Sequence, residues 1–218
     1  MKRLATILLT LAVITGTPVF AAPGIEFSPD AGTAGSWSYD GAGTLSFDQY
    51  VAVDSAMGSN ADALVGSLVY VPTLTVNASG GGSYSLKPLG SSLLTVRSAD
   101  DSTIYLQATL GKGDLAPVGT IGAAYTSFTT DLTDVYVTDA GKALGSAVLS
   151  AIVNSNITTL DFELSLQGGS GTNYYSFAQM LAGGYVGGNG FSGAMSIPEP
   201  ATIAMLSLGS LALLRKRR

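Results

Sequence analysis

The sequence of 218 residues contains neither histidine nor cysteine. The lack of histidine excludes Ser-His-Asp and Cys-His nucleophile systems and imidazole metal ligands. The lack of cysteine excludes thiolate nucleophiles, cysteine-ligated zinc, iron–sulfur clusters and disulfide frameworks. Most familiar arrangements of catalytic residues need histidine or cysteine, which this chain lacks. We therefore expect a protein that is not an enzyme and that has no catalytic residue, bound metal or cofactor.

Charged residues are also scarce, at 11% of the chain, whereas hydrophobic residues make up 46% and there are 28 glycines. This glycine content is well above the average, but the composition is neither collagen-like nor too polar to collapse. We therefore expect a folded domain with an apolar core.

The first residues have the pattern of a secretory signal peptide. Lys2 and Arg3 precede an apolar run over residues 4–16, and Ala21 and Ala22 are small residues suited to cleavage. A run of this length is short for a bilayer core of roughly 30 Å, which disfavours the alternative of an uncleaved membrane anchor; a buried N-terminal helix is the other alternative. We predict a signal peptide over residues 1–21, removed by signal peptidase near Ala21 or Ala22.

The opposite end combines three unlike elements. An uncharged apolar segment, residues 201–214, follows a Pro-Glu-Pro triplet and precedes four consecutive bases; the triplet is Pro198, Glu199 and Pro200, and the bases are Arg215, Lys216, Arg217 and Arg218. As a helix the segment would be about 21 Å long, short for a permanent span. The basic tail is expected to stop on the cytoplasmic side. A tail that binds nucleic acid is the alternative, which an apolar run in an exported chain disfavours.

This tail resembles the PEP-CTERM sorting signal of exopolysaccharide-producing Gram-negative bacteria, which is also labelled an ice-binding protein C-terminal domain. The resemblance covers Ile197 to Arg218. It implies that exosortase, a membrane protease, recognises Pro198, Glu199 and Pro200 and releases or transfers the protein. It also implies transient insertion into the inner membrane and delivery to the cell surface or extracellular matrix.

The region between the two signals, residues 22–195, is strongly acidic. It holds four bases against fourteen acids, a formal net charge of −10. This charge disfavours binding to nucleic acid or to an anionic membrane.

Alternation of apolar and polar residues dominates the same region. A period of two, typical of strands with one wet face, occurs over residues 45–53, 104–110 and 160–167, and glycine-rich turns separate the candidate strands. Residues 68–76 form an apolar run broken by Pro72, and residues 140–154 have helical spacing after a candidate N-cap at Asp139. We predict a mainly β fold: a single antiparallel β-sandwich of jelly-roll type with one short helix, flanked by the signal peptide and the hydrophobic sorting helix of residues 196–218.

Three groups of residues are candidate sites within the sandwich. Asp161 and Glu163 share one strand face with Cβ atoms about 6.5 to 7 Å apart, a separation that can serve glycoside hydrolysis, although charged residues are the default on a polar face. Scattered acids could bind calcium, but no complete calcium loop is present; these are Asp100, Asp101, Asp131, Asp134 and Asp139. Aromatic residues could stack on sugars, although most such residues are ordinary strand residues; these are Trp37, Tyr39, Tyr174, Tyr175 and Tyr185.

From these observations we expect an exported, non-enzymatic protein of the cell surface or extracellular matrix, structural or adhesive and associated with exopolysaccharide or biofilm. The alternatives are a carbohydrate-binding module and a secreted glycoside hydrolase that uses carboxylates alone. A buried pair of acids in a cleft would favour the hydrolase, and an aromatic-lined groove would favour the sugar-binding module.

Overall fold

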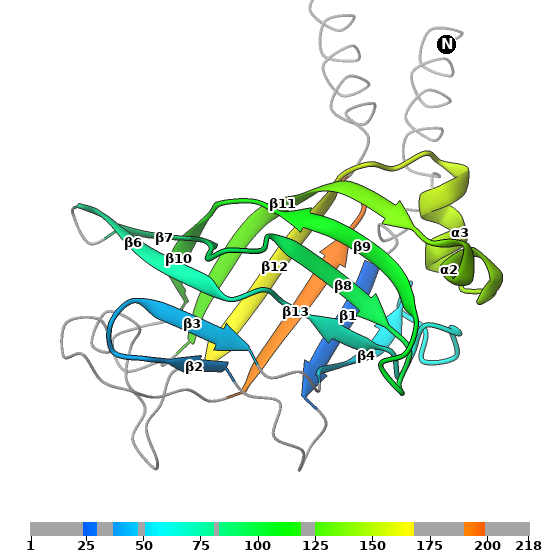
Figure 1. The fold of residues 1–218 in the computed structure, drawn as a ribbon, viewed down its shortest axis with the longest axis horizontal. Helices are drawn as coiled ribbons and strands as arrows, with labels where there is room; N and C mark the ends of the chain where they lie inside the picture. Colours follow the sequence, from blue (N-terminus) through cyan, green and yellow to red (C-terminus); the bar gives the residue numbers. More distant parts are fainter. Residues whose placement is uncertain are drawn as a thin grey trace, which may run out of the picture.

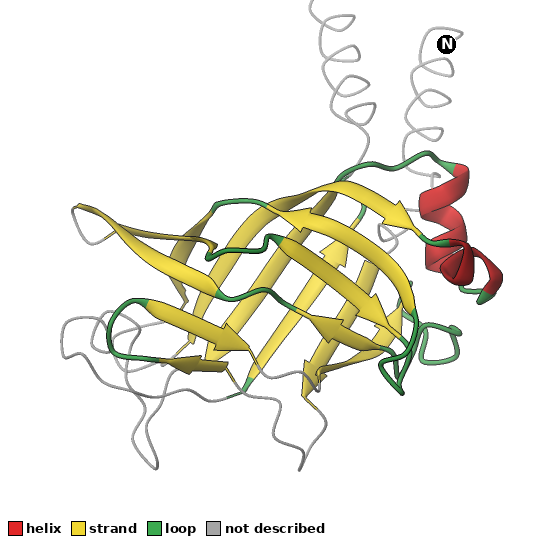
Figure 2. Cartoon of the chain, in the orientation of Figure 1, coloured by secondary structure: helices red, strands yellow, loops and turns green. Residues whose placement is uncertain are grey.

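The computed structural model describes residues 24–29, 37–47, 51–80, 83–118, 125–167 and 190–198. The structure is mainly β, with 58% strand (Figure 2). The strands are β1 (Gly24–Pro29), β2 (Trp37–Tyr39), β3 (Thr44–Phe47), β4 (Val51–Ala56), β5 (Leu68–Tyr70), β6 (Leu74–Gly80), β7 (Ser83–Pro88), β8 (Leu93–Arg97), β9 (Ile104–Leu110), β10 (Gly113–Val118), β11 (Tyr125–Val137), β12 (Leu160–Gln167) and β13 (Phe191–Ser196). The helices are α2 (Asp139–Ala143) and α3 (Ala147–Asn154).

Among the described residues, eight antiparallel strands form a closed barrel, and five further strands extend from it. The barrel runs in the order β11-β12-β13-β1-β4-β5-β8-β9 and closes because β9 pairs with β11 (Figure 1). The extension continues from β11 through β10, β7, β6 and β3 to β2. The prediction of a jelly-roll sandwich is therefore wrong, although the prediction of a mainly β chain is confirmed.

The long strand β11 explains how one sheet forms both a barrel and an extension. Residues 125–132 pair with β12 along one edge. Along the other edge, residues 125–129 pair with β10, and residues from Leu132 to Val137 pair with β9. Because sandwiches and barrels share the same two-residue alternation, the sequence pattern could not distinguish them. The difference lies in which distant strands pair.

The barrel interior is filled by alternating apolar side chains. On β12 the buried residues are Leu160, Phe162, Leu164 and Leu166, whereas Asp161 and Glu163 are exposed. The predicted strand over residues 160–167 is thus confirmed, as is the strand over 104–110. The apolar run containing Pro72 divides into β5 and β6, and Pro72 lies between them.

Aromatic rings pack against one another within this interior. Phe162 stacks on Phe27 with ring centroids 6.2 Å apart and meets the edge of Phe128 at 6.3 Å. The ring of Phe191 meets those of Phe27 and Phe47 edge to face, with ring centroids 6.5 Å and 5.3 Å apart, respectively. Because Phe47 belongs to β3, this last contact ties the extension to barrel strand β13.

The helical segment lies at one end of the barrel (Figure 1). The spacing predicts one helix over residues 140–154, but the structure has two, separated at Gly145, whose φ of +81° suits glycine. The N-cap of α2 is Thr138 rather than Asp139, because the Thr138 side chain accepts a hydrogen bond from the Gly141 N–H. Ser146 caps α3 in the same manner.

Asp62 attaches α3 to the segment between β4 and β5. Its Oδ2 accepts a hydrogen bond from the Ala147 N–H at 2.8 Å, and its Oδ1 accepts one from the Leu64 N–H at 2.9 Å. Partial burial opposes ionisation of Asp62, but the hydrogen bonds from Leu64, Ser146 and Ala147 outweigh it and lower the pKa of this carboxyl. The ionised carboxylate thus fixes the start of α3 against this segment.

Candidate functional site

A shallow groove of about 710 Å³ lies on the outer face of the barrel, across β10, β11, β12 and β13. Its lining includes one base, four acids and the last residue of β13; these are Lys112, Asp114, Asp131, Asp161, Glu163 and Ser196. The groove therefore contains the carboxylate pair considered above and lies beside the start of the predicted sorting signal.

Strand register places the acids in two rows. In the first row, Asp114 lies opposite Thr129, Thr129 opposite Glu163, and Glu163 opposite Ala194. In the second row, Asp131 lies directly opposite Asp161, which lies opposite Ser196. Like charges that face each other across two strands destabilise a sheet. The groove is thus an anionic surface maintained at some cost in stability.

Asp161 and Glu163 do not have the surroundings of a hydrolytic pair. Both side chains are exposed, and Glu163 accepts a hydrogen bond from the Ser127 hydroxyl at 2.9 Å. A general acid in glycoside hydrolysis is kept protonated by burial or by a special environment. The exposure of this pair fits the interpretation that Asp161 and Glu163 are charged residues on the solvent-exposed face of their strand.

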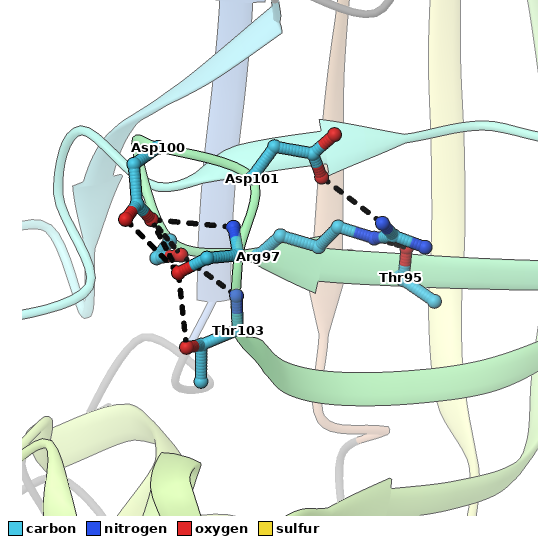
Figure 3. A network of polar contacts seen from close by, with 7 residues as sticks. Thr95, Arg97, Asp100, Asp101 and Thr103 are labelled. Carbon is cyan, nitrogen blue, oxygen red and sulfur yellow. Dashed lines mark hydrogen bonds and ion pairs between the residues drawn. The ribbon is translucent and has the colours of Figure 1, made fainter.

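The candidate calcium ligands lie in separate elements. Asp100 and Asp101 belong to the turn between β8 and β9, where Asp100 accepts hydrogen bonds from Ser98 and Ser102 and Asp101 pairs with Arg97 at 3.0 Å (Figure 3). The hydroxyl of Ser98 is the main cause of the lowered pKa of Asp100. The carboxylates of this turn thus stabilise the turn itself.

The other candidate calcium ligands lie on β11 and α2. Asp131 and Asp134 are on β11, and Asp139 on α2 pairs with Lys142 at 2.9 Å. Across the described ranges, no group of three or more acidic, histidine or cysteine side chains could hold a metal ion.

The aromatic candidates divide into buried residues and residues that the structure does not describe. Trp37 and Tyr39 on β2 are 1% and 3% exposed. Their rings fill the core and present no stacking surface for a sugar. Tyr174, Tyr175 and Tyr185 lie outside the described residues.

Three serines form a polar row that the sequence analysis did not single out. Ser127 on β11 lies opposite Ser165 on β12, which lies opposite Ser192 on β13. Neighbouring strands are about 4.8 Å apart, so the row presents hydroxyl groups at a regular spacing on the outer face. Alternation could have indicated that each serine faces outward, but only the register shows that the three are neighbours.

The predicted sorting signal begins where β13 ends. Ser196 is the last residue of this strand, and Ile197 packs against the hydrophobic core. Pro198 is the last described residue, and Glu199, Pro200 and the basic residues Arg215 to Arg218 lie outside the described residues, as do Ala21 and Ala22. The described helices are all too short or too polar to cross a membrane. The apolar segment 201–214 is outside the described ranges.

Comparison with known proteins agrees with the interpretation of the tail. A family model for the PEP-CTERM protein-sorting motif matches residues 196–218, about a tenth of the chain. No curated protein and no solved structure matches the chain. The predicted resemblance to the PEP-CTERM sorting signal is confirmed. The chain therefore carries a PEP-CTERM protein-sorting motif at its C-terminal end, which indicates an exported protein that is processed by exosortase, a membrane protein.

Proposed function

We propose that this chain is a non-enzymatic exosortase substrate whose barrel becomes a structural or adhesive component of an exopolysaccharide matrix. Signal peptidase removes residues 1–21, and exosortase recognises Pro198, Glu199 and Pro200. The apolar segment 201–214 enters the inner membrane transiently, and the basic tail stops its transfer. The observation that carries the proposal is the sorting motif at residues 196–218, which continues directly from barrel strand β13.

In this proposal, the outer polar face of β11, β12 and β13 binds the polysaccharide of the matrix. The acidic groove repels anionic polymers, whereas serine hydroxyls bond to neutral sugars as both donors and acceptors. Ser127 already donates to Glu163, so Ser165 and Ser192 are the members of the row assigned to the sugar. Many weak contacts of this kind give useful avidity along a polymer with repeated units.

Replacing Glu199 with alanine tests the sorting step. In the native host, the parent protein is expected to lose its C-terminal segment, whereas Glu199→Ala keeps it and accumulates unprocessed in the membrane fraction. The readouts are the intact mass of the purified protein and an immunoblot of membrane, surface and medium fractions. Glu163→Gln removes a carboxylate from the barrel instead and is the control, expected to be processed normally. A parent protein that retains Arg218 at the cell surface contradicts the proposal.

Removing the two serine hydroxyls tests the matrix contact. The Ser165→Ala, Ser192→Ala double variant is expected to bind the host's purified exopolysaccharide about 5- to 150-fold more weakly per repeat, because it removes two hydroxyls and each hydrogen bond contributes about 0.5–1.5 kcal/mol. Co-sedimentation of the purified barrel with the polymer measures this affinity. The matched control replaces Ser38 and Ser46, an exposed cross-strand pair on β2 and β3. Equal weakening in both double variants would exclude the serine row as the specific contact.

A further inference from the structure

Four residues from adjacent chain segments form a row at the end of the barrel where the sorting motif begins. The Met57 N–H donates a hydrogen bond to the Gly24 carbonyl at 2.8 Å. Gly24 lies opposite Ser196, and Ser196 lies opposite Asp161. We call Met57, Gly24, Ser196 and Asp161 the rim row. With strands about 4.8 Å apart, Met57 lies about 10 Å from the first residue of the motif.

The link between the rim row and the recognised triplet is short. Ser196 is held in the sheet between β1 and β12, and Ile197 packs against the core. Glu199 follows Ile197 by two residues, a span of at most about 7 Å. A protein that binds Glu199 on a closed barrel therefore also lies against the rim row.

Barrel topology indicates that the barrel is closed while the motif is still intact. Strand β13 pairs with β1 on one side and with β12 on the other, so closure requires the chain through Ser196. When that residue has been exported, residues 197–218 remain beyond it, and they include the whole recognised triplet. The closed barrel and the unprocessed motif can therefore exist together at the membrane.

Met57 has two properties that point to a contact at this rim. It is 46% exposed, although it is a large apolar side chain. It also has a positive φ of 54°, followed by Gly58 at 69°, in a two-residue turn closed by hydrogen bonds between Ala56 and Ser59. Such a turn favours Asn-Gly, and bulky residues adopt this conformation rarely. Residues held in sparsely populated φ/ψ regions cluster at functional sites, where the surrounding structure maintains them.

We propose that the sorting enzyme binds the closed barrel at the rim row, with Met57 as the apolar contact, so that its substrate is the folded barrel together with the motif. This inference rests on the proposed function, because it requires processing at Pro198, Glu199 and Pro200. The partner is the membrane enzyme, and the contact surface is formed by the turn after β4, the start of β1 and the end of β13.

Met57→Asn separates a role in folding from a role in binding. Asparagine tolerates the positive φ of this turn better than methionine, so the variant is expected to have an equal or higher melting temperature. It is nevertheless expected to be processed several-fold more slowly in a pulse–chase experiment in the native host. The matched control is Leu89→Asn, which changes a side chain that is 51% exposed and lies after β7. Since β7 is separated from β13 by β10, β11 and β12, this control is expected to be processed at the parental rate.

A six-residue Gly-Ser spacer inserted between Ile197 and Pro198 tests the short link. The spacer allows the triplet to move up to about 20 Å from the rim row, and processing is expected to slow several-fold. The same spacer inserted between Asp100 and Asp101 leaves the link unchanged and is the control. Circular dichroism and thermal melting verify that both proteins are folded.

The outcomes distinguish this inference from the proposed function. If Met57→Asn or the spacer variant is processed at the parental rate or faster, the enzyme recognises the motif alone and the inference is wrong. A photo-crosslinker at position 57 is expected to capture the sorting enzyme, identified by mass spectrometry, and a crosslinker at position 89 is not; capture of lipid alone at position 57 overturns the inference in favour of a membrane contact. If Glu199→Ala is processed normally, the proposed function itself fails.

Discussion

Replacing Gly193 with alanine is expected to destabilise the barrel by about 2–3 kcal/mol, the upper part of the range for overpacked cores. A Cβ at this position would lie 2.3 Å from Cζ of Phe27 and 2.8 Å from the Glu163 carbonyl oxygen. The first contact requires a ring to move, and the second requires the backbone of β12 to move. Both distances are well below van der Waals contact.

Phe27 has little room to move. Its side chain is 1% exposed, and its ring is stacked on Phe162 and meets the edge of Phe191. Displacing the ring would disturb its contacts with Phe162 and Phe191, and displacing β13 would disturb its pairing with β1 and β12. The strain that a Cβ at position 193 introduces therefore cannot be relieved locally, and we expect it to lower the free energy of unfolding of the whole barrel.

Urea denaturation of the parent and of Gly193→Ala measures this effect as a lower midpoint with an unchanged m-value. The matched control is Ser192→Thr, which also adds one carbon to β13 but on the exposed outer face. Its stability is expected to stay within about 0.5 kcal/mol of the parent. If both variants lose the same stability, the close approach of Phe27 to Gly193 is not the reason that an alanine at position 193 destabilises the barrel.

The sequence predicted local features well because local residues determine them. The alternation over residues 160–167 specified both the strand and the outward direction of Asp161 and Glu163, as the structure confirms. The sorting motif was equally accessible, since its three elements are contiguous in the chain. Each of these features depends on neighbours within a few residues.

The closed barrel, the groove and the rim row depend on pairings between distant residues. The pairing of Gly24 with Ser196 joins the first and last described strands, and alternation contains no information about such partners. Alternation also could not show that Asp131 lies opposite Asp161, because this pairing follows from the register of β11 and β12. Met57 was not singled out, because its importance comes from its place beside Gly24 and from its positive φ.

Replacing Phe162 with alanine is expected to cost about 3–5 kcal/mol, the range for truncating a buried aromatic side chain. Phe162 is 2% exposed and lies between Phe27 and Phe128. Truncation removes buried apolar surface and leaves a cavity that the surrounding strands cannot fill, because their backbones are fixed by the closed ladder. Since domains of this size are stable by about 5–15 kcal/mol, the change removes a large share of the total.

Two companion variants decide whether the ring cluster itself causes this loss. Tyr136→Ala removes an aromatic ring that is 48% exposed and is expected to cost far less. In a double-mutant cycle with Phe27→Leu and Phe162→Leu, the coupling energy is expected to be about 0.5–1.5 kcal/mol, as for stacked aromatic pairs. A coupling near zero would mean that Phe162 stabilises the barrel through buried area alone. A clear coupling would mean that the stacked rings of β1 and β12, which both flank β13, help to hold in place the strand that leads to the sorting motif.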